Sequence, residues 1–330
     1  MLASQTAFSS IEGVKKIEDR GEIRVAVNSN DFYPFHYKKR NGEMDGIDIK
    51  IAQNIAKELN VKLFLIEAGQ KPDSVIELVS TNDADIGISY LSITIERSKK
   101  VYFTTPYLIN RYAILLDNSQ DGAFATEMNP AKMISLGSNI ALGVVEGTSY
   151  VENVRTLFPK AKIVEFKNWN EAIRAISKKR IFGYIDDEFS LKQMLFSKPE
   201  LLINYSAVPL ENTRDSIAIA VSPQNSDLIQ WLNIYLNERM VFLKNEDHDE
   251  INEYLRISKW IPGQKIKSNP EFGNSSLFSD RTEREEKEES NIKENLVLIM
   301  VSAFTILSII VLFIITPKKD KKEYKHFTLT

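Results

Sequence analysis

The same alternation of apolar strand and amphipathic helix occurs twice along the chain, and this order constrains the fold more than any single motif. In the first stretch, strands at residues 22–28, 61–67 and 85–89 alternate with helices near residues 46–59 and 73–80. Apolar residues occupy every second position of the first strand and recur at four-residue spacing in the first helix. Strands joined through crossover helices are expected to pair in parallel.

The second stretch repeats this order about 50 residues later. Strands are expected at residues 139–145, 162–166 and 181–186, with helices near residues 149–158 and 170–179 between them. Two such units fit well within a chain of 330 residues, which is long enough for two lobes with real cores. The sequence therefore predicts an α/β fold in which each of two similar lobes contains one β-α-β-α-β sheet unit, with a cleft between the lobes.

Three further elements follow the second unit. They are a strand at residues 215–221 and two helices at residues 227–244 and, approximately, 249–260. Residues 263–295 are polar and end in a charged run, which is typical of a solvated stalk.

The bulk composition limits the classes of function. The net charge of −3 and the pI of about 5.8 give no basic field for nucleic acid. The absence of cysteine excludes thiol nucleophiles, thiolate metal sites, disulfides and a lipid-modified cysteine. The three histidines, His36, His248 and His326, are far apart, and no common hydrolase, metalloprotease, phosphate-loop or dinucleotide motif occurs. We therefore expect no catalytic residue, no metal site and no cofactor.

An uncharged segment of 21 residues at positions 296–316 predicts one membrane-spanning helix. The following residues, 317–330, carry five lysines against two acids, whereas residues 280–295 are predominantly acidic. The positive-inside rule therefore places the lysine-rich tail in the cytoplasm and everything before Leu296 outside. The expected location is the cell membrane, with a single pass and an extracytoplasmic N-terminal domain.

The two ends of the chain do not match this topology fully. Residues 1–10 have neither a basic region nor an apolar core, so we expect that a native signal peptide is missing or that the start is misplaced. The 14 residues after the span are too few for a cytoplasmic domain.

Hydroxyl groups and one arginine follow the buried strand at residues 85–89. The run from Ser92 to Tyr107 begins Ser-Ile-Thr-Ile-Glu-Arg, so Ser92, Thr94 and Arg97 lie just past the carboxyl end of that strand. Open α/β sheets bind small anions at this edge, and the planar guanidinium matches a carboxylate. Without further context, a surface arginine paired with Glu96 is the more common explanation for Arg97.

With Asp83-Ala84-Asp85-Ile86 before it, this run resembles the signature of the family 3 extracytoplasmic solute-binding proteins of the amino-acid-binding type. The resemblance covers residues 11–260 and implies the two-lobed, type II periplasmic-binding-protein-like fold. It implies a discontinuous first lobe (residues 11–112 and 213–262), a second lobe (residues 113–212), and last helices that pack on the first lobe.

The resemblance also implies a ligand site. Arg97 occupies the position that holds the ligand α-carboxylate, Ser92 and Thr148 add donors, and Asp187 is at the position that pairs with the ligand ammonium. Thr94 is either a ligand contact or a helix cap, and Asp187 is otherwise a solvated acid beside Asp186. The full set of expected ligand-binding residues is Arg97, Ser92, Asp187, Thr148, Phe32, Thr94, Tyr90, Ser29 and Tyr33.

Two positions depart from the resembled pattern. Tyr90 stands where relatives carry a small residue, so it either narrows the pocket or turns outward. Ile47 replaces an aromatic residue, while Asp48 is expected to support its helix rather than to touch the ligand.

These features favour a binding module that closes on a small amino acid or related carboxylate. Its partner is either an ABC-type amino-acid importer or, because of the predicted span, the signalling part of a truncated sensor of histidine kinase or diguanylate cyclase type. A dehydratase-like enzyme on the same fold is the remaining alternative.

Overall fold

The computed structural model describes residues 12–120, 140–243 and 249–259 of the chain. These residues all belong to one compact unit that ends at Lys265. Within these three ranges, no helix has the length and apolar character that a membrane crossing requires. The first ten residues, the predicted stalk (263–295), the predicted span (296–316) and the tail (317–330) lie outside the described residues, so those predictions stay untested.

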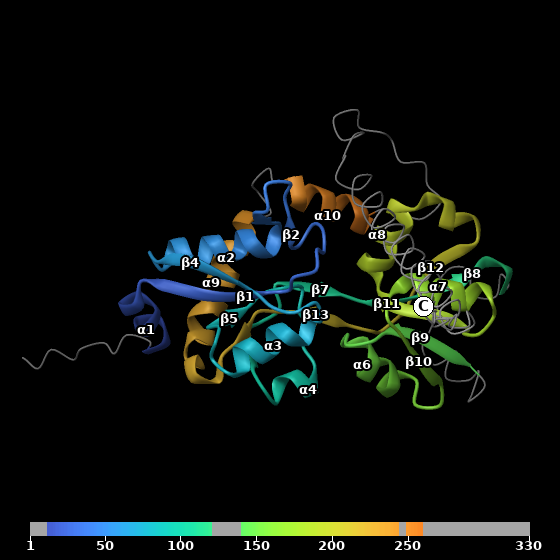
Figure 1. Ribbon diagram of the computed structural model, residues 1–330, viewed down its shortest axis with the longest axis horizontal. Helices are drawn as coiled ribbons and strands as arrows, with labels where there is room; N and C mark the ends of the chain where they lie inside the picture. Colours follow the sequence, from blue (N-terminus) through green and yellow to red (C-terminus); the bar gives the residue numbers. More distant parts are fainter. Residues whose placement is uncertain (1–11, 121–139, 244–248, 260–330) are drawn as a thin grey trace, which may run out of the picture. The chain divides into compact units, whose positions relative to one another are not determined.

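The first sheet has the strand order β4-β1-β5-β14-β6 (Figure 1). Its strands are β1 (Glu22–Val27), β4 (Lys62–Glu67), β5 (Ile86–Gly87), β6 (Tyr102–Phe103) and β14 (Ala220–Val221). β1 pairs in parallel with both β4 and β5, as predicted, whereas β14 pairs antiparallel with β5 and β6.

Helices cover both faces of this sheet. Ile23, Val25 and Val27 on one face of β1 share a core cluster with α2 (Ile47–Glu58), and Ala26 on the other face shares one with α3 (Pro72–Ser80). Smaller elements complete the lobe: α1 (Glu12–Arg20), β2 (Tyr37–Lys38), β3 (Met44–Asp45), α4 (Ile95–Ser98), η4 (Pro223–Asn225) and α9 (Leu228–Leu243).

The second sheet has the order β10-β9-β11-β8-β12. Its strands are β8 (Tyr112–Asp117), β9 (Ala141–Val145), β10 (Lys162–Phe166), β11 (Gly183–Asp187) and β12 (Tyr205–Pro209). β9 pairs in parallel with β10 and β11, and β8 pairs antiparallel with β11 and β12. The surrounding helices are η1 (Asn118–Gln120), α6 (Tyr150–Leu157), α7 (Trp169–Ser177), α8 (Glu188–Ser197) and η3 (Pro199–Ile203).

Two short strands connect the sheets. The chain leaves the first sheet through β7 (Leu108–Asn110) and returns through β13 (Asp215–Ile217), and these two strands pair antiparallel with each other. The single strand predicted at residues 215–221 is therefore wrong. It divides into β13 and β14 because its first part pairs with β7 and its last part pairs with the first sheet.

Helix α10 (Asp249–Lys259) contacts α8 of the second lobe in addition to the first lobe, which is the only lobe named in the expectation. Ile257 is buried in the core of the first lobe. The ring of Tyr254 lies 5.7 Å from that of Phe35 in the first lobe and 5.1 Å from that of Phe189 in α8. The amine of Lys192 on α8 also donates to the carbonyl of Ser258, 2.8 Å away, near the end of α10.

Asp85 joins several elements of the first lobe immediately before β5. Its fully buried carboxylate accepts from the backbone amide of Arg24 (2.8 Å), from the Arg24 guanidinium (2.9 Å) and from the guanidinium of Arg20. The amide of Asn225 in η4 adds a longer contact of 3.3 Å. One side chain thereby holds together β1, α1, β5 and the segment before α9.

We predict that Asp85→Asn lowers the free energy of unfolding by about 3 kcal/mol, because the two guanidinium groups lose a buried charged partner. Urea denaturation of the full chain measures the change. Glu67→Gln is the matched control, since it breaks an exposed ion pair between Lys38 and Glu67 that is worth no more than about 1 kcal/mol. Equal losses in the two variants would contradict the structural role of Asp85.

Candidate ligand-binding site

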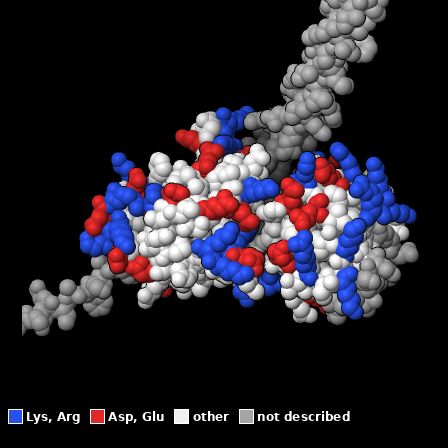
Figure 2. All heavy atoms as spheres, turned by 60° about the horizontal axis from the view of Figure 1, so that its bottom comes forward, with Lys and Arg blue, Asp and Glu red and all other residues white. Residues whose placement is uncertain are grey.

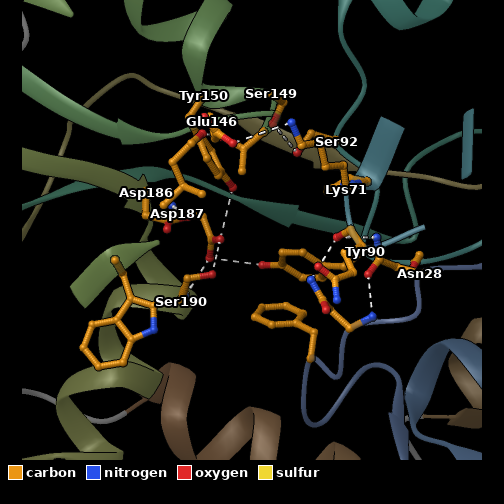
Figure 3. Close-up of a pocket in the computed structure, with 18 of the residues that line it drawn as sticks. Asn28, Lys71, Tyr90, Ser92, Glu146, Ser149, Tyr150, Asp186, Asp187 and Ser190 are labelled. Atoms are coloured by element: carbon orange, nitrogen blue, oxygen red, sulfur yellow. Dashed lines mark hydrogen bonds and ion pairs between the residues drawn. The ribbon is translucent and has the colours of Figure 1, made fainter. Parts of the chain in front are cut away.

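A cavity of about 570 Å³ lies where the carboxyl ends of the parallel strands in the two sheets face each other (Figure 3). The loops that follow β1, β4 and β5 line it from the first lobe, and those that follow β9, β10 and β11 line it from the second. This is the edge at which open α/β sheets bind ligands. Six of the residues expected from the sequence line this cavity: Arg97, Ser92, Asp187, Thr148, Phe32 and Tyr90.

Arg97 is held rigidly at the cavity wall. Its side chain is only 6% exposed, with Nε donating to Oδ1 of Asp73 (2.9 Å) and Nη1 donating to the carbonyl of Ser92 (3.0 Å). Among the described residues, none accepts a hydrogen bond from Nη2. A fixed guanidinium with one free nitrogen beside a cavity is suited to a carboxylate ligand.

Two serine hydroxyls extend this polar wall across the lobes. The hydroxyl of Ser149, at the start of α6, donates to that of Ser92 over 3.0 Å, and Ser92 donates to Oδ2 of Asp215 (3.2 Å). The hydroxyl of Thr148 donates to the carbonyl of Val145 (2.7 Å), so its side chain shapes the turn before α6. The first turn of α6 still presents backbone amides and the positive end of the helix dipole to the cavity.

Asp187 is 1% exposed at the end of β11, where its carboxylate also caps α8. Oδ1 accepts from the hydroxyl of Tyr90 (3.1 Å), the amide of Asn110 (2.8 Å) and the backbone of Ser190 (2.8 Å). Oδ2 accepts from the hydroxyls of Tyr150 (3.1 Å) and Ser190. Burial raises the pKa of Asp187 above its usual value, although the donors of Ser190 oppose this change.

Tyr90 points into the cavity rather than outward (Figure 3). Its backbone has φ +50°, in the left-handed region, and its amide donates to Oδ2 of Asp48 over 2.9 Å. The ring centroid lies 4.3 Å from that of Phe35 and 4.9 Å from that of Phe32. Burial and the charge of Asp187 raise the pKa of Tyr90 well above its usual value. The phenol is therefore a neutral hydrogen-bond donor.

The other three expected residues, Ser29, Thr94 and Tyr33, lie outside the lining of the cavity. Thr94 caps α4, because its hydroxyl accepts from the amide of Arg97 over 3.1 Å. The ring of Tyr33 packs on Tyr37 with 5.1 Å between centroids, and its carbonyl accepts from the side chain of Gln193.

Sequence reasoning missed several residues that line the cavity: Ser149, Tyr150, Trp169 and Asp186. Trp169 begins α7 directly after β10, so the rule that ligands bind past strand ends would have found it. Asp186 accepts from the hydroxyl of Tyr184 and from the amide of Asp187 (2.9 Å). Burial, together with the charge of Asp187, raises the pKa of Asp186 well above its usual value.

Charge pairs also cross between the lobes. Lys71 follows β4 and its amine lies 3.6 Å from the carboxylate of Glu146, which follows β9. The face shown in Figure 2 carries both signs of charge, so acidic and basic side chains compensate each other there. No group of three or more His, Asp or Glu side chains within the described ranges is arranged to hold a metal ion.

Asp215, at the start of connecting strand β13, lies behind this site. Burial and the nearby charge of Asp187 raise its pKa to about 6. Its Oδ2 accepts from Ser92 and from the hydroxyl of Tyr150 (2.9 Å), whereas Oδ1 is buried without a partner among the described residues. Tyr150 has one proton to share between Asp187 and Asp215, which favours a protonated carboxyl on Asp215.

We predict that Asp215 makes the protein less stable as the pH rises from about 4 to about 7. Because its folded pKa is raised, its contribution is complete below pH 3.8 and is lost as the pH passes about 6, by about 3 kcal/mol. Asp215→Asn cannot titrate, so its unfolding free energy relative to that of the wild type should increase with pH across this window. Urea denaturation at several pH values tests this, and a difference that is constant with pH would contradict it.

The chain is similar in sequence to several proteins of known function. The chain is 26% identical over 211 residues to the ABC transporter arginine-binding protein 1 of Escherichia coli, covering 62% of this chain and 80% of that one. It is 25% identical over 275 residues to the ABC transporter glutamine-binding protein GlnH of Bacillus subtilis, covering 79% and 92%. It is also 29% identical over 126 residues to the cyclohexadienyl dehydratase of Pseudomonas aeruginosa, covering 38% and 46%.

Solved structures show the same fold. An ancestral amino acid-binding protein, a precursor of cyclohexadienyl dehydratase, matches with a TM-score of 0.54 and 26% identity over 75% of this chain and 98% of its own. The substrate-binding protein AbpA of Streptococcus pneumoniae, bound to L-arginine, matches with a TM-score of 0.57 and 23% identity over 75% and 100%. The family model of the bacterial extracellular solute-binding proteins, family 3, matches residues 23–253, and the chain belongs to this family.

Proposed function

We propose that this chain is an extracytoplasmic receptor whose two lobes close on a small amino acid-like carboxylate. The observation that carries the proposal is the buried guanidinium of Arg97, fixed by Asp73 at the wall of a cavity between the lobes, with Nη2 free for a ligand. Arginine offers the planar donors that a carboxylate requires, and burial strengthens such bonds.

The expected residues that line the cavity each have a role in this proposal. Arg97 donates to the ligand carboxylate together with the first amides of α6, which Thr148 orients, and Ser92 joins them when its hydroxyl turns from Asp215 to the ligand. Phe32, Tyr90 and Asp187 form the opposite wall. Ser29, Thr94 and Tyr33 act from outside the cavity, and Thr94 does so by fixing the backbone of Arg97.

The names of the relatives support an amino acid-like ligand and an ABC-type importer as the partner. Two of them are named as arginine- and glutamine-binding proteins of ABC transporters, and one matched structure holds L-arginine. The closed receptor therefore presents itself to an ABC-type importer. The apolar segment 296–316, which lies outside the described residues, tethers it to the membrane with the binding domain outside.

Helix α10 favours a second candidate function, the binding domain of a sensor. It contacts both lobes through Tyr254 and precedes the predicted stalk and membrane span. A change in the separation of the lobes must displace this helix, so closure could be passed along the chain to a signalling partner.

An enzyme remains the weaker alternative. The matched dehydratase covers only 38% of this chain, whereas the arginine- and glutamine-binding relatives cover more of it. Turnover of a cyclic organic acid by the purified chain would favour the enzyme, and binding without product would favour the receptor.

We predict that Arg97→Ala abolishes ligand-induced stabilisation of the full chain. A ligand at 100 times its Kd adds about 2.7 kcal/mol to the stability of the wild type, so its melting temperature should rise by several degrees. Thermal unfolding against the standard amino acids and their 2-keto and 2-hydroxy counterparts identifies the ligand.

Two further variants make this test specific. Arg97→Lys keeps the charge but loses the planar donors, so affinity should fall by about tenfold or more. Arg174→Ala removes an exposed arginine on α7 and should bind like the wild type. Unchanged affinity in Arg97→Ala would overturn the carboxylate assignment.

A further inference from the structure

The carboxylate of Asp187 already has as many donors as it can accept. Five hydrogen atoms point at its two oxygens, from the side chains of Tyr90, Asn110, Tyr150 and Ser190 and from the backbone of Ser190. A carboxylate has about four lone-pair positions. Even if Tyr150 gives its proton to Asp215 instead, four donors remain. No acceptor position is left for the ammonium group of a ligand.

Tyr90 occupies the space in front of Asp187. Its hydroxyl accepts from the amide of Asn110 over 2.7 Å and donates to Oδ1 of Asp187. Figure 3 shows the contact between Tyr90 and Asp187. The ring is fixed on its other side by Phe32 and Phe35. An α-ammonium could reach Asp187 only after this phenol had moved away.

The backbone holds the phenol in this place. The left-handed conformation of Tyr90 is costly for a bulky residue, and it persists because the amide is bonded to the buried carboxylate of Asp48. Asp48 is itself fixed by the hydroxyl of Tyr107 (2.7 Å) and by Nδ1 of His36 (3.1 Å). Tyr90 is thus positioned by three elements of the first lobe.

Apart from Asp186 and Asp187, three bases and two acids line the cavity: Arg97, Lys71, Lys167, Asp31 and Glu146. Nη2 of Arg97 has no acceptor among the described residues, Glu146 is paired with Lys71, and Asp31 accepts from the backbone amide of Lys38 (2.9 Å). This balance favours an anion. Asp186 precedes Asp187, and its two oxygens accept from the hydroxyl of Tyr184 and from the amide of Asp187, which occupies part of its acceptor positions. Its burial also favours the neutral carboxyl, which is a poor partner for a cation.

We propose that Tyr90 is a specificity-determining residue that takes the place of a ligand ammonium, so that this receptor selects small carboxylates without an α-ammonium group. The inference rests on the proposed function and names its ligand class: 2-keto acids, 2-hydroxy acids and other carboxylates with a neutral α-substituent. An α-amino acid would have to bury its ammonium without the carboxylate of Asp187 as an acceptor, which weakens its binding relative to that of the acid without the amine.

The test measures the affinity of the full chain for matched pairs, each consisting of an α-amino acid and the 2-keto or 2-hydroxy acid with the same side chain. Titration calorimetry should show that the wild type binds the acid without the amine at least tenfold more tightly. In Tyr90→Gly the phenol is gone and glycine tolerates the positive φ. This ratio should then fall by at least tenfold. Tyr90→Phe keeps the ring in front of Asp187 but removes one of its donors, so its ratio should lie between those of the wild type and Tyr90→Gly.

The outcomes separate this inference from the proposed function. A wild type that prefers the amino acid of a pair overturns the inference, whatever the variants do. If that binding still requires Arg97, the receptor function stands. A ratio that is unchanged in Tyr90→Gly also overturns the role of Tyr90. If neither class binds the wild type or Tyr90→Gly, the proposed function and the inference both fail.

Discussion

The buried carboxylate of Asp48 is the interaction on which the site depends. It lies in the first turn of α2, fully buried, and accepts from the amide of Tyr90, the hydroxyl of Tyr107 and the ring of His36. These partners belong to the loop after β5, the segment before connecting strand β7 and the loop after β1. The helix dipole also stabilises a negative charge at this position. One carboxylate thus sets the positions of two cavity-lining loops and of the segment before β7, whose own sequences do not specify how they meet.

Three pairs of side chains join one lobe to the other. Tyr90 contacts Asp187, Ser149 contacts Ser92, and Lys71 lies near Glu146. In the proposed receptor, such contacts would stabilise a closed form before any ligand binds. A ligand shifts the equilibrium only through its differential affinity for that form. The stronger these contacts between the lobes are, the less binding free energy the ligand has to supply for closure.

The sequence predicted the repeated strand–helix order and the parallel pairing because apolar periodicity reports directly on burial. It did not reveal that residues 215–221 change sheets, since no glycine or proline interrupts the run DSIAIAV. At the site, Arg97 and Thr94 differ in a way that spacing cannot show. Both follow β5, yet one side chain faces the cavity while the other turns back to cap α4. Residue type and position identify which groups are near a site, whereas the rotamers and competing backbone donors decide which groups reach it.

The two strands that connect the lobes carry residues of the polar network around Asp187. Asp215 on β13 is paired in register with Asn110 on β7, and Asn110 donates to both Tyr90 and Asp187. Any rotation about this two-stranded connection therefore changes the donors of Asp187 and the surroundings of Asp215. The elevated pKa of Asp215 depends on this buried arrangement, because burial and the nearby charge of Asp187 cause it.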